Sequence, residues 1–285
     1  MNEYGFSKTS VELNDKNGIE YADRALSIDP NLALALAVKS KIKLYSTEFL
    51  RKKYDISQII NDFKKALQIE PHNPSTLNWI GLAYQILGYH KQALEYYSLC
   101  VNYEPRYTPC LTNTMNTHQI LGNYKKAVNL YREGLSNGLL DVSKAPFWAL
   151  AKLNNELAFV SGLNAPGLFP RWHRNGEIYL AYKNSTLDHS ELAKAADEFL
   201  LEKDKTVESW PLMLAPLGFH NPNEKLYVYV FGGIQKDINS PRIKTYIKQS
   251  GIYDYWVSYG YPPQCRPLPD SKVKGDFECS NDPLE

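Results

Sequence analysis

The sequence predicts an all-α protein in which helical hairpins stack into a solenoid and an irregular C-terminal segment caps the stack. Three segments with the same ending support this prediction: 25–31 (ALSIDPN), 66–73 (ALQIEPHN) and 99–107 (LCVNYEPRY). Pro71 and Pro105 lie 34 residues apart. A repeat of that length is typical of stacked helical hairpins, each too small to bury its apolar face alone.

The first predicted helix covers 18–28 and ends just before Pro30. It is similar to the second helix of a hairpin, so its partner helix would lie at or before Met1. We therefore expect either that the chain is cut from a longer protein or that 2–15 form an irregular cap.

The next predicted hairpin consists of a helix over 33–45 and a helix over 56–69, both with apolar residues at helical spacing. Pro30 and Pro71 are 41 residues apart, seven more than one repeat. We expect these extra residues in the turn, around 47–57.

Two further units, 74–107 and 108–139, place the same residue types at the same positions. Small residues stand where paired helices cross closely, aromatic residues fill the remaining space, and a proline ends the second helix. In the first unit these residues are Leu77, Gly81, Ala83, Tyr84, Gly88, Tyr89, Ala93, Tyr97, Cys100 and Pro105. In the second unit they are Leu111, Met115, Thr117, His118, Gly122, Tyr124, Ala127, Tyr131 and Gly134. The pattern resembles the tetratricopeptide repeat family, and the resemblance implies a right-handed superhelical solenoid that binds a protein or peptide.

Helical periodicity continues beyond Gly138, although the repeat becomes irregular. Apolar residues three and four apart predict further helices at 145–162, 171–184, 190–203 and 208–219. The residues of 226–233 favour a strand by propensity, but a lone strand would have no partner, so we expect a helix there. A last helix covers 240–251, opened by a proline and closed by a glycine. The predicted domains are repeats with a partial N-terminal repeat (1–139), divergent hairpins (140–251) and an aromatic cap (252–285).

The tail concentrates aromatic residues, prolines and two cysteines. It resembles the C-terminal end of bacterial tetratricopeptide proteins whose repeats follow a ToxR/CadC-type winged-helix domain or a nucleotide-cyclase domain. The residues that carry this resemblance are Pro241, Arg242, Gly251, Asp254, Tyr255, Trp256, Gly260, Pro263, Cys265, Arg266, Pro267, Asp276, Phe277, Glu278 and Cys279. It implies the sensory or regulatory half of a bacterial signalling protein or transcriptional regulator. It also implies a periplasmic location, reached through a membrane segment upstream; a cytoplasmic location is the alternative.

Cysteine positions bear on the compartment. Cys265 and Cys279 enclose a proline-rich loop, and we expect a disulfide that pins the aromatic tail across the open end of the solenoid. The alternative is two reduced cysteines that pack as small apolar groups. Cys100 and Cys110 lie at the end of one helix and the start of the next, so their side chains could be close. We interpret them as buried thiols.

Composition excludes some classes of function. Apolar residues make up 44% of the chain and charged residues 22%, with a net charge of +1. Without a concentrated basic face, we expect no direct nucleic-acid binding. The chain as given contains no apolar run of membrane-spanning length and no export signal at its start, so we expect no membrane insertion.

No arrangement typical of catalysis, metal binding or cofactor binding is present, so we expect a binding protein and not an enzyme. The six histidines are isolated, and no glycine-rich phosphate loop precedes a helix. Arg171, His173 and Arg174 most simply begin a helix, with an anion clamp as the alternative. The rival function is an enzyme or enzyme-associated domain with a site near these residues and Trp210.

The predicted binding surface lies on the first helices of the hairpins, which line the concave groove of such stacks. Its residues are Lys41, Tyr45, Asn78, Leu82, Gln85, Thr112, Asn116 and Gln119. Amides both donate and accept hydrogen bonds, which suits an extended peptide backbone; ordinary solvated side chains are the alternative. Only Lys41 is cationic, which argues against a clamp for the carboxylate of chaperone tails. The same fold as a cytosolic assembly adaptor is a third possibility, and the oligomeric state stays open.

Overall fold

The computed structural model describes residues 14–50, 52–141, 145–153, 239 and 241–280, except 270, 272 and 274. The chain divides into two compact units, one formed by Met1–Leu121 with Lys225–Glu285 and the other by Gly122–Glu224. The predicted helices at 171–184, 190–203, 208–219 and 226–233 lie outside the described residues, as does the second half, 154–162, of the helix predicted at 145–162. The predicted domain boundaries stay predictions.

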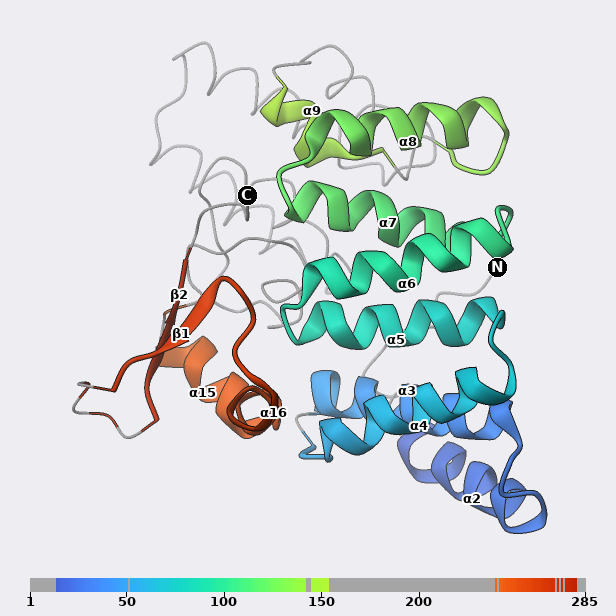
Figure 1. Cartoon of the computed structure of the whole chain (residues 1–285), viewed down its shortest axis with the longest axis vertical. Coiled ribbons are helices and arrows are strands. Elements are labelled where there is room, and N and C mark those ends of the chain that lie inside the picture. The colour runs from blue at the N-terminus through green and yellow to red at the C-terminus, as the bar shows by residue number, and fades with distance from the viewer. Residues whose placement is uncertain are drawn as a thin grey trace, which may run out of the picture. The chain divides into compact units, whose positions relative to one another are not determined.

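The first unit is a stack of helical hairpins with a small C-terminal module beside it (Figure 1). Its elements are η1 (Asn14–Gly18, a π-helical turn), α2 (Ile19–Ile28), α3 (Ala33–Leu50), α4 (Ile56–Ile69), α5 (Pro74–Ile86), α6 (His90–Tyr103), α7 (Thr108–Ile120), α15 (Pro241–Gln249), α16 (Ile252–Tyr259), β1 (Cys265–Pro267) and β2 (Phe277–Cys279). Helices α3 and α4 pair, as do α5 and α6. The predicted all-α solenoid of hairpins is confirmed.

Local sequence explains where these helices begin. The side chain of Asp55 accepts a hydrogen bond from the backbone N–H of Gln58 at the start of α4. Asn73 does the same for Thr76 at the start of α5, with Pro74 as the first helical residue. Such caps satisfy backbone donors that have no partner inside the helix.

The close crossing of α5 and α6 depends on one glycine. A Cβ atom at Gly81 would lie 2.6 Å from the ring of Tyr97, which is fully buried. The small residue therefore lets the two helices meet over this ring, as the repeat pattern predicts.

The first hairpin and the segment before it differ in detail from the prediction. The first helix, α3, continues to Leu50 instead of ending near Tyr45, so part of the insertion lengthens the helix and the turn is shorter than expected. Upstream, η1 precedes α2 directly.

The C-terminal module contains a helix and a hairpin that the sequence did not predict. Helix α16 follows Gly251, whose φ of 88° is left-handed, and β1 pairs with β2 in an antiparallel ladder. Cys265 and Cys279 face each other in this ladder and are joined by a disulfide, with their Cα atoms 4.0 Å apart.

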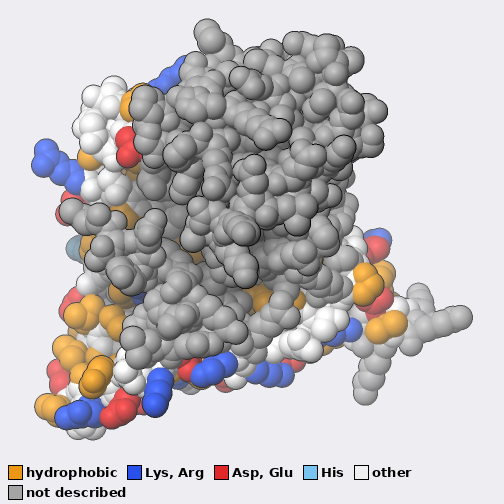
Figure 2. Space-filling model, turned by 180° about the vertical axis from the view of Figure 1, so that it is seen from behind, with side chains coloured by type: hydrophobic (Ala, Val, Ile, Leu, Met, Phe, Trp, Pro, Cys, Tyr) orange, Lys and Arg blue, Asp and Glu red, His pale blue; other side chains and the backbone are white. Residues whose placement is uncertain are grey.

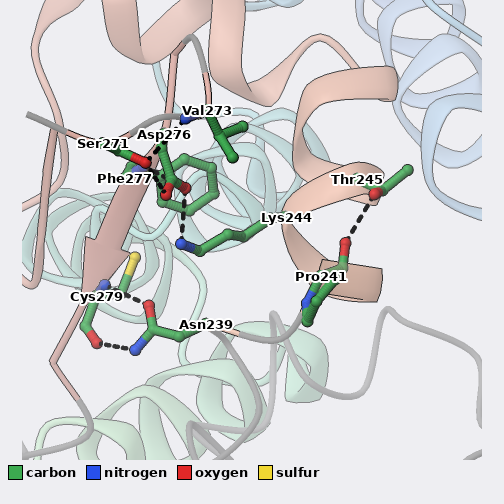
Figure 3. Close-up of polar contacts among 9 residues, drawn as sticks. All are labelled: Asn239, Pro241, Lys244, Thr245, Ser271, Val273, Asp276, Phe277 and Cys279. Atoms are coloured by element: carbon green, nitrogen blue, oxygen red, sulfur yellow. Dashed lines mark hydrogen bonds and ion pairs between the residues drawn. The ribbon is translucent and has the colours of Figure 1, made fainter. Parts of the chain in front are cut away.

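Side chains from before and within α15 hold this hairpin (Figure 3). The Asn239 amide donates to the backbone carbonyl of Cys279 and accepts from its N–H, both at 2.8 Å, as a neighbouring strand would. Lys244 donates to Asp276 at 2.7 Å. Ser271 and the N–H of Phe277 also donate to that carboxylate, and these donors lower the pKa of Asp276 to about 2.

The second unit is described over α8 (Tyr124–Ser136) and α9 (Phe147–Lys152), which pack against each other. Helix α8 follows the turn at Gly122, as predicted for the second helix of its repeat.

Candidate partner-binding face

The first helices of successive hairpins lie next to one another, since α5 contacts α3 on one side and α7 on the other. Residues at equivalent repeat positions on these helices therefore follow one another along one surface. We call this surface the first-helix face. Its partly exposed residues are Lys41, Tyr45, Trp79, Leu82, Thr112 and Asn116.

Three amides of the predicted groove are buried. Asn78, Gln85 and Gln119 expose 7%, 4% and 7% of their surface. The Asn113 amide donates to Asn78 Oδ1 at 2.9 Å, which links α7 to α5. These amides are therefore less available to a ligand than the sequence suggested.

Gln85 belongs to a buried polar contact between helices. The hydroxyl of Tyr97 on α6 donates to Gln85 Oε1 at 3.0 Å, and Thr117 on α7 lies 3.5 Å from the same oxygen. Because unsatisfied buried polar atoms are costly, this contact fixes the register of three helices. Its role is structural.

Trp79 is a residue of the face that the predicted groove did not include. Its indole lies beneath the ammonium of Lys41, with Nζ 4.9 Å from the ring centre, while the Tyr45 ring centre is 5.5 Å from Nζ. The only sequence signal for this contact is that Trp79 occupies a first-helix position that turns towards the preceding repeat. Burial lowers the pKa of Lys41.

In contrast to the partly exposed first-helix face, the turn between α5 and α6 is covered. The C-terminal module docks on the turn between α5 and α6, where the Trp256 indole donates to the carbonyl of Leu87 and the Gln264 amide donates to that of Gly88, both at 2.9 Å. Tyr89 donates to the carbonyl of Gly260. The module thus lies on the side of the hairpins, and the prediction that it covers the open end of the solenoid is wrong.

Further contacts extend this docking site to the turn before α4. Lys53 forms an ion pair with Asp254, and Gly251 lies against the carbonyl of Tyr54. Tyrosine rings from both partners pack together, as Tyr89 meets Tyr255 at 6.0 Å between ring centres. The residues of the tail motif therefore build the module and attach it.

Cys100 and Cys110 form a second disulfide, with Cα atoms 6.1 Å apart. The interpretation of this pair as buried thiols is wrong, because the end of α6 and the start of α7 come close enough to be joined. All four cysteines of the sequence are thus paired. The pairs stabilise the connection between two repeats and the hairpin of the module.

A hollow with several charged residues in its lining lies beside η1 and α2. It has a volume of about 570 Å³ and is lined by residues of η1 and α2 together with Tyr54. The buried carboxylate of Asp15 accepts hydrogen bonds from Lys52 and Tyr54, and burial with this contact raises the pKa of Tyr54 to about 12. These contacts join η1 to the segment before α4.

Charge is mixed over the described surface. Figure 2 shows Lys and Arg side chains beside Asp and Glu along the lower edge of the molecule. Among the described residues, no group of His, Cys, Asp and Glu is arranged to hold a metal ion. The described helices include none with the length and apolarity to cross a bilayer. The proposed anion site (Arg171, His173, Arg174) and Trp210 lie outside the described residues.

The hairpin that carries Trp79 and Leu82 is similar to a known repeat family. Residues 74–107 match the tetratricopeptide repeat family. These residues are α5, α6 and the connection to Tyr107. Tetratricopeptide repeats generally bind protein partners, so the match supports a protein-interaction scaffold. No curated protein matches the chain.

Proposed function

We propose that this protein is a non-catalytic tetratricopeptide scaffold that binds an extended segment of a partner protein along the first-helix face. The observation that carries the proposal is the alignment of partly exposed residues on α3, α5 and α7, which combine one cation, two aromatic rings, an aliphatic side chain, a hydroxyl and an amide. This mixture suits a peptide, whose backbone needs hydrogen bonds and whose side chains need apolar contacts.

We further propose that the scaffold is the sensory or regulatory module of a bacterial signalling or transcription-regulatory protein, located in the periplasm. The pairing of all four cysteines supports an oxidising compartment. The tail motif supports the regulatory role through its resemblance to the tails of bacterial tetratricopeptide proteins that carry regulatory domains.

Site-specific cross-linking tests the binding surface. A photo-reactive phenylalanine analogue replaces Leu82 on the first-helix face, and in a matched variant it replaces Leu99, which is 42% exposed on the second helix of the same hairpin. In an extract of the cells that make the protein, we expect the Leu82 variant to capture a discrete partner, cross-linked through one peptide segment. Equal capture at both positions, or none at Leu82, would contradict the proposal.

A further inference from the structure

A strip of tyrosine rings runs from α6 across α5 and the covered turn to α16. Tyr96 stacks on Tyr84 with ring centres 5.6 Å apart, and Tyr84 meets Tyr89 edge-on at 6.3 Å. Tyr89 in turn meets Tyr255 at 6.0 Å, and Tyr255 stacks on Tyr259 at 4.6 Å. We call these five residues the tyrosine strip. None of them belongs to the first-helix face, so the strip is a separate surface.

Most of the strip is accessible although the C-terminal module is docked beside it. Tyr84, Tyr89 and Tyr96 are partly exposed, and Tyr259 exposes 60% of its surface. Tyrosine is enriched at protein interfaces, because its ring offers apolar contact and its hydroxyl offers a hydrogen bond. A row of such rings at the surface therefore has the composition of a contact site.

The protein's own chain shows which kind of segment fits beside these rings. Pro262 of the module is buried against the turn, where a Cβ atom at Gly88 would lie 3.2 Å from the proline ring. Two residues before this proline, the carbonyl of Gly260 accepts a hydrogen bond from the Tyr89 hydroxyl. Aromatic-lined grooves bind proline-rich segments, whose polyproline II conformation is formed before binding. One end of the strip already holds a segment of this kind.

The polar groups of the strip also match a proline-rich segment. A proline offers a carbonyl acceptor and no N–H donor, so the surface that binds it must supply donors. Tyrosine hydroxyls are protonated donors at neutral pH, since burial raises the pKa of Tyr84 and of Tyr96, and that of Tyr89 to about 12. Lys64 and Glu95 shift the pKa of Tyr96 in opposite directions. Charges of both signs thus flank this end of the strip, which favours an uncharged ligand.

We propose that the tyrosine strip binds a proline-rich segment of a partner protein in the polyproline II conformation. The ring centres from Tyr96 through Tyr84 and Tyr89 to Tyr255 follow one another at 5.6, 6.3 and 6.0 Å. Two residues of polyproline II advance by about 6 Å. Prolines at alternate positions can therefore contact successive rings. This surface is distinct from the first-helix face, so the inference does not rest on the proposed function.

Calorimetric titration of the full chain with defined probes tests the strip. The probe is acetylated and amidated octaproline, and the control is an octapeptide of alternating alanine and glycine with the same end groups. We expect saturable binding of octaproline and weaker binding of the control by about fivefold or more. A chitin hexasaccharide is the third probe, because sugars also stack on aromatic rings. Absence of octaproline binding, equal binding of the two peptides, or binding of the sugar alone would overturn the inference.

Variants separate the strip from other exposed tyrosines. Tyr259→Ala removes an exposed ring and Tyr84→Phe removes one hydroxyl but keeps its ring, so both should retain the fold, which circular dichroism checks. Both should weaken octaproline binding by about threefold or more. Tyr103→Ala is the matched control, since Tyr103 is 49% exposed on α6 but lies outside the strip. Unchanged binding in either strip variant, or an equal loss in the control, would overturn the inference, whereas cross-linking at Leu82 decides the proposed function.

Discussion

The turn between α5 and α6 is covered by the C-terminal module, whereas the first-helix face, to which α5 contributes, keeps partly exposed side chains. At the turn, the carbonyls of Leu87 and Gly88 accept hydrogen bonds from Trp256 and Gln264, so the C-terminal module covers the backbone. On the first-helix face, the Lys41 ammonium lies over the Trp79 and Tyr45 rings, and several side chains remain partly exposed. The difference indicates that the covered turn serves stability, whereas the proposed function assigns the partner to the first-helix face.

The largest expected effect comes from the covered turn. Trp256→Ala should lower the free energy of unfolding by about 3–5 kcal/mol, as truncation of a buried aromatic residue usually does, because Trp256 is 3% exposed and donates to Leu87. Urea denaturation followed by circular dichroism measures the change. Val257→Ala is the matched control, since Val257 is 59% exposed on the same helix. Similar losses for both variants would mean that the module does not seal the turn.

Removing each disulfide in turn tests whether the C-terminal module and the first-helix face act independently. Replacing Cys265 and Cys279 by serine, or Cys100 and Cys110 by serine, should each cost about 3 kcal/mol through the lost constraint on the unfolded chain. Only the second pair lies next to the first-helix face, because it joins α6 to α7. We therefore expect cross-linking at Leu82 to survive loss of the first pair. Intact mass with and without thiol alkylation establishes the pairing; alkylation of unreduced protein from the periplasm would contradict it.

Acid should destabilise the protein through His90, which begins the helix after the covered turn. His90 begins α6 and is 3% exposed, and burial lowers its pKa from 6.5 to about 4. Between pH 6.5 and about 4, the unfolded chain therefore binds a proton at His90 that the folded protein does not bind. The stability from neutral His90 is complete above pH 6.5 and falls by about 3 kcal/mol as the pH drops to about 4. Below that pH the folded protein binds the proton as well.

A variant isolates this contribution from other acid effects. The difference in unfolding free energy between the wild type and His90→Gln should shrink or reverse between about pH 7 and pH 4.5, measured by urea denaturation. Parallel profiles for wild type and His90→Gln would show that His90 is not the group responsible.

The smallest effects distinguish buried from partly exposed amides. Asn78→Ala should cost about 1–2 kcal/mol, because it leaves the amide of Asn113 without its acceptor. Asn116 is partly exposed and accepts one hydrogen bond, from the Gln119 amide. We therefore expect Asn116→Ala to cost less, about 0.5 kcal/mol, and to weaken cross-linking at Leu82. Thermal unfolding and the cross-linking yield are the two measurements. A loss of stability for Asn116→Ala as large as that for Asn78→Ala would remove the distinction between the two amides.

The hairpins were predictable because their signals are local. Prolines end the second helices, Gly81 stands where α5 crosses α6, and Asn73 caps the next helix. The burial of Asn78 and Gln85 was not predictable in the same way. Their spacing assigns them to a helix face, but their burial depends on how closely Tyr97 and Asn113 approach from other helices.

The sequence by itself determined the repeat, the starts of α4 and α5 and the presence of a distinct tail, since each depends on side chains within a few residues of one another. Tertiary structure alone decided that the tail attaches to a turn 169 residues earlier, and that Lys41 extends over Trp79 on the next hairpin. The physical reason is that such contacts depend on the packing of side chains far apart along the chain. Helical periodicity states which face of a helix is apolar, but it does not state which distant segment will cover that face.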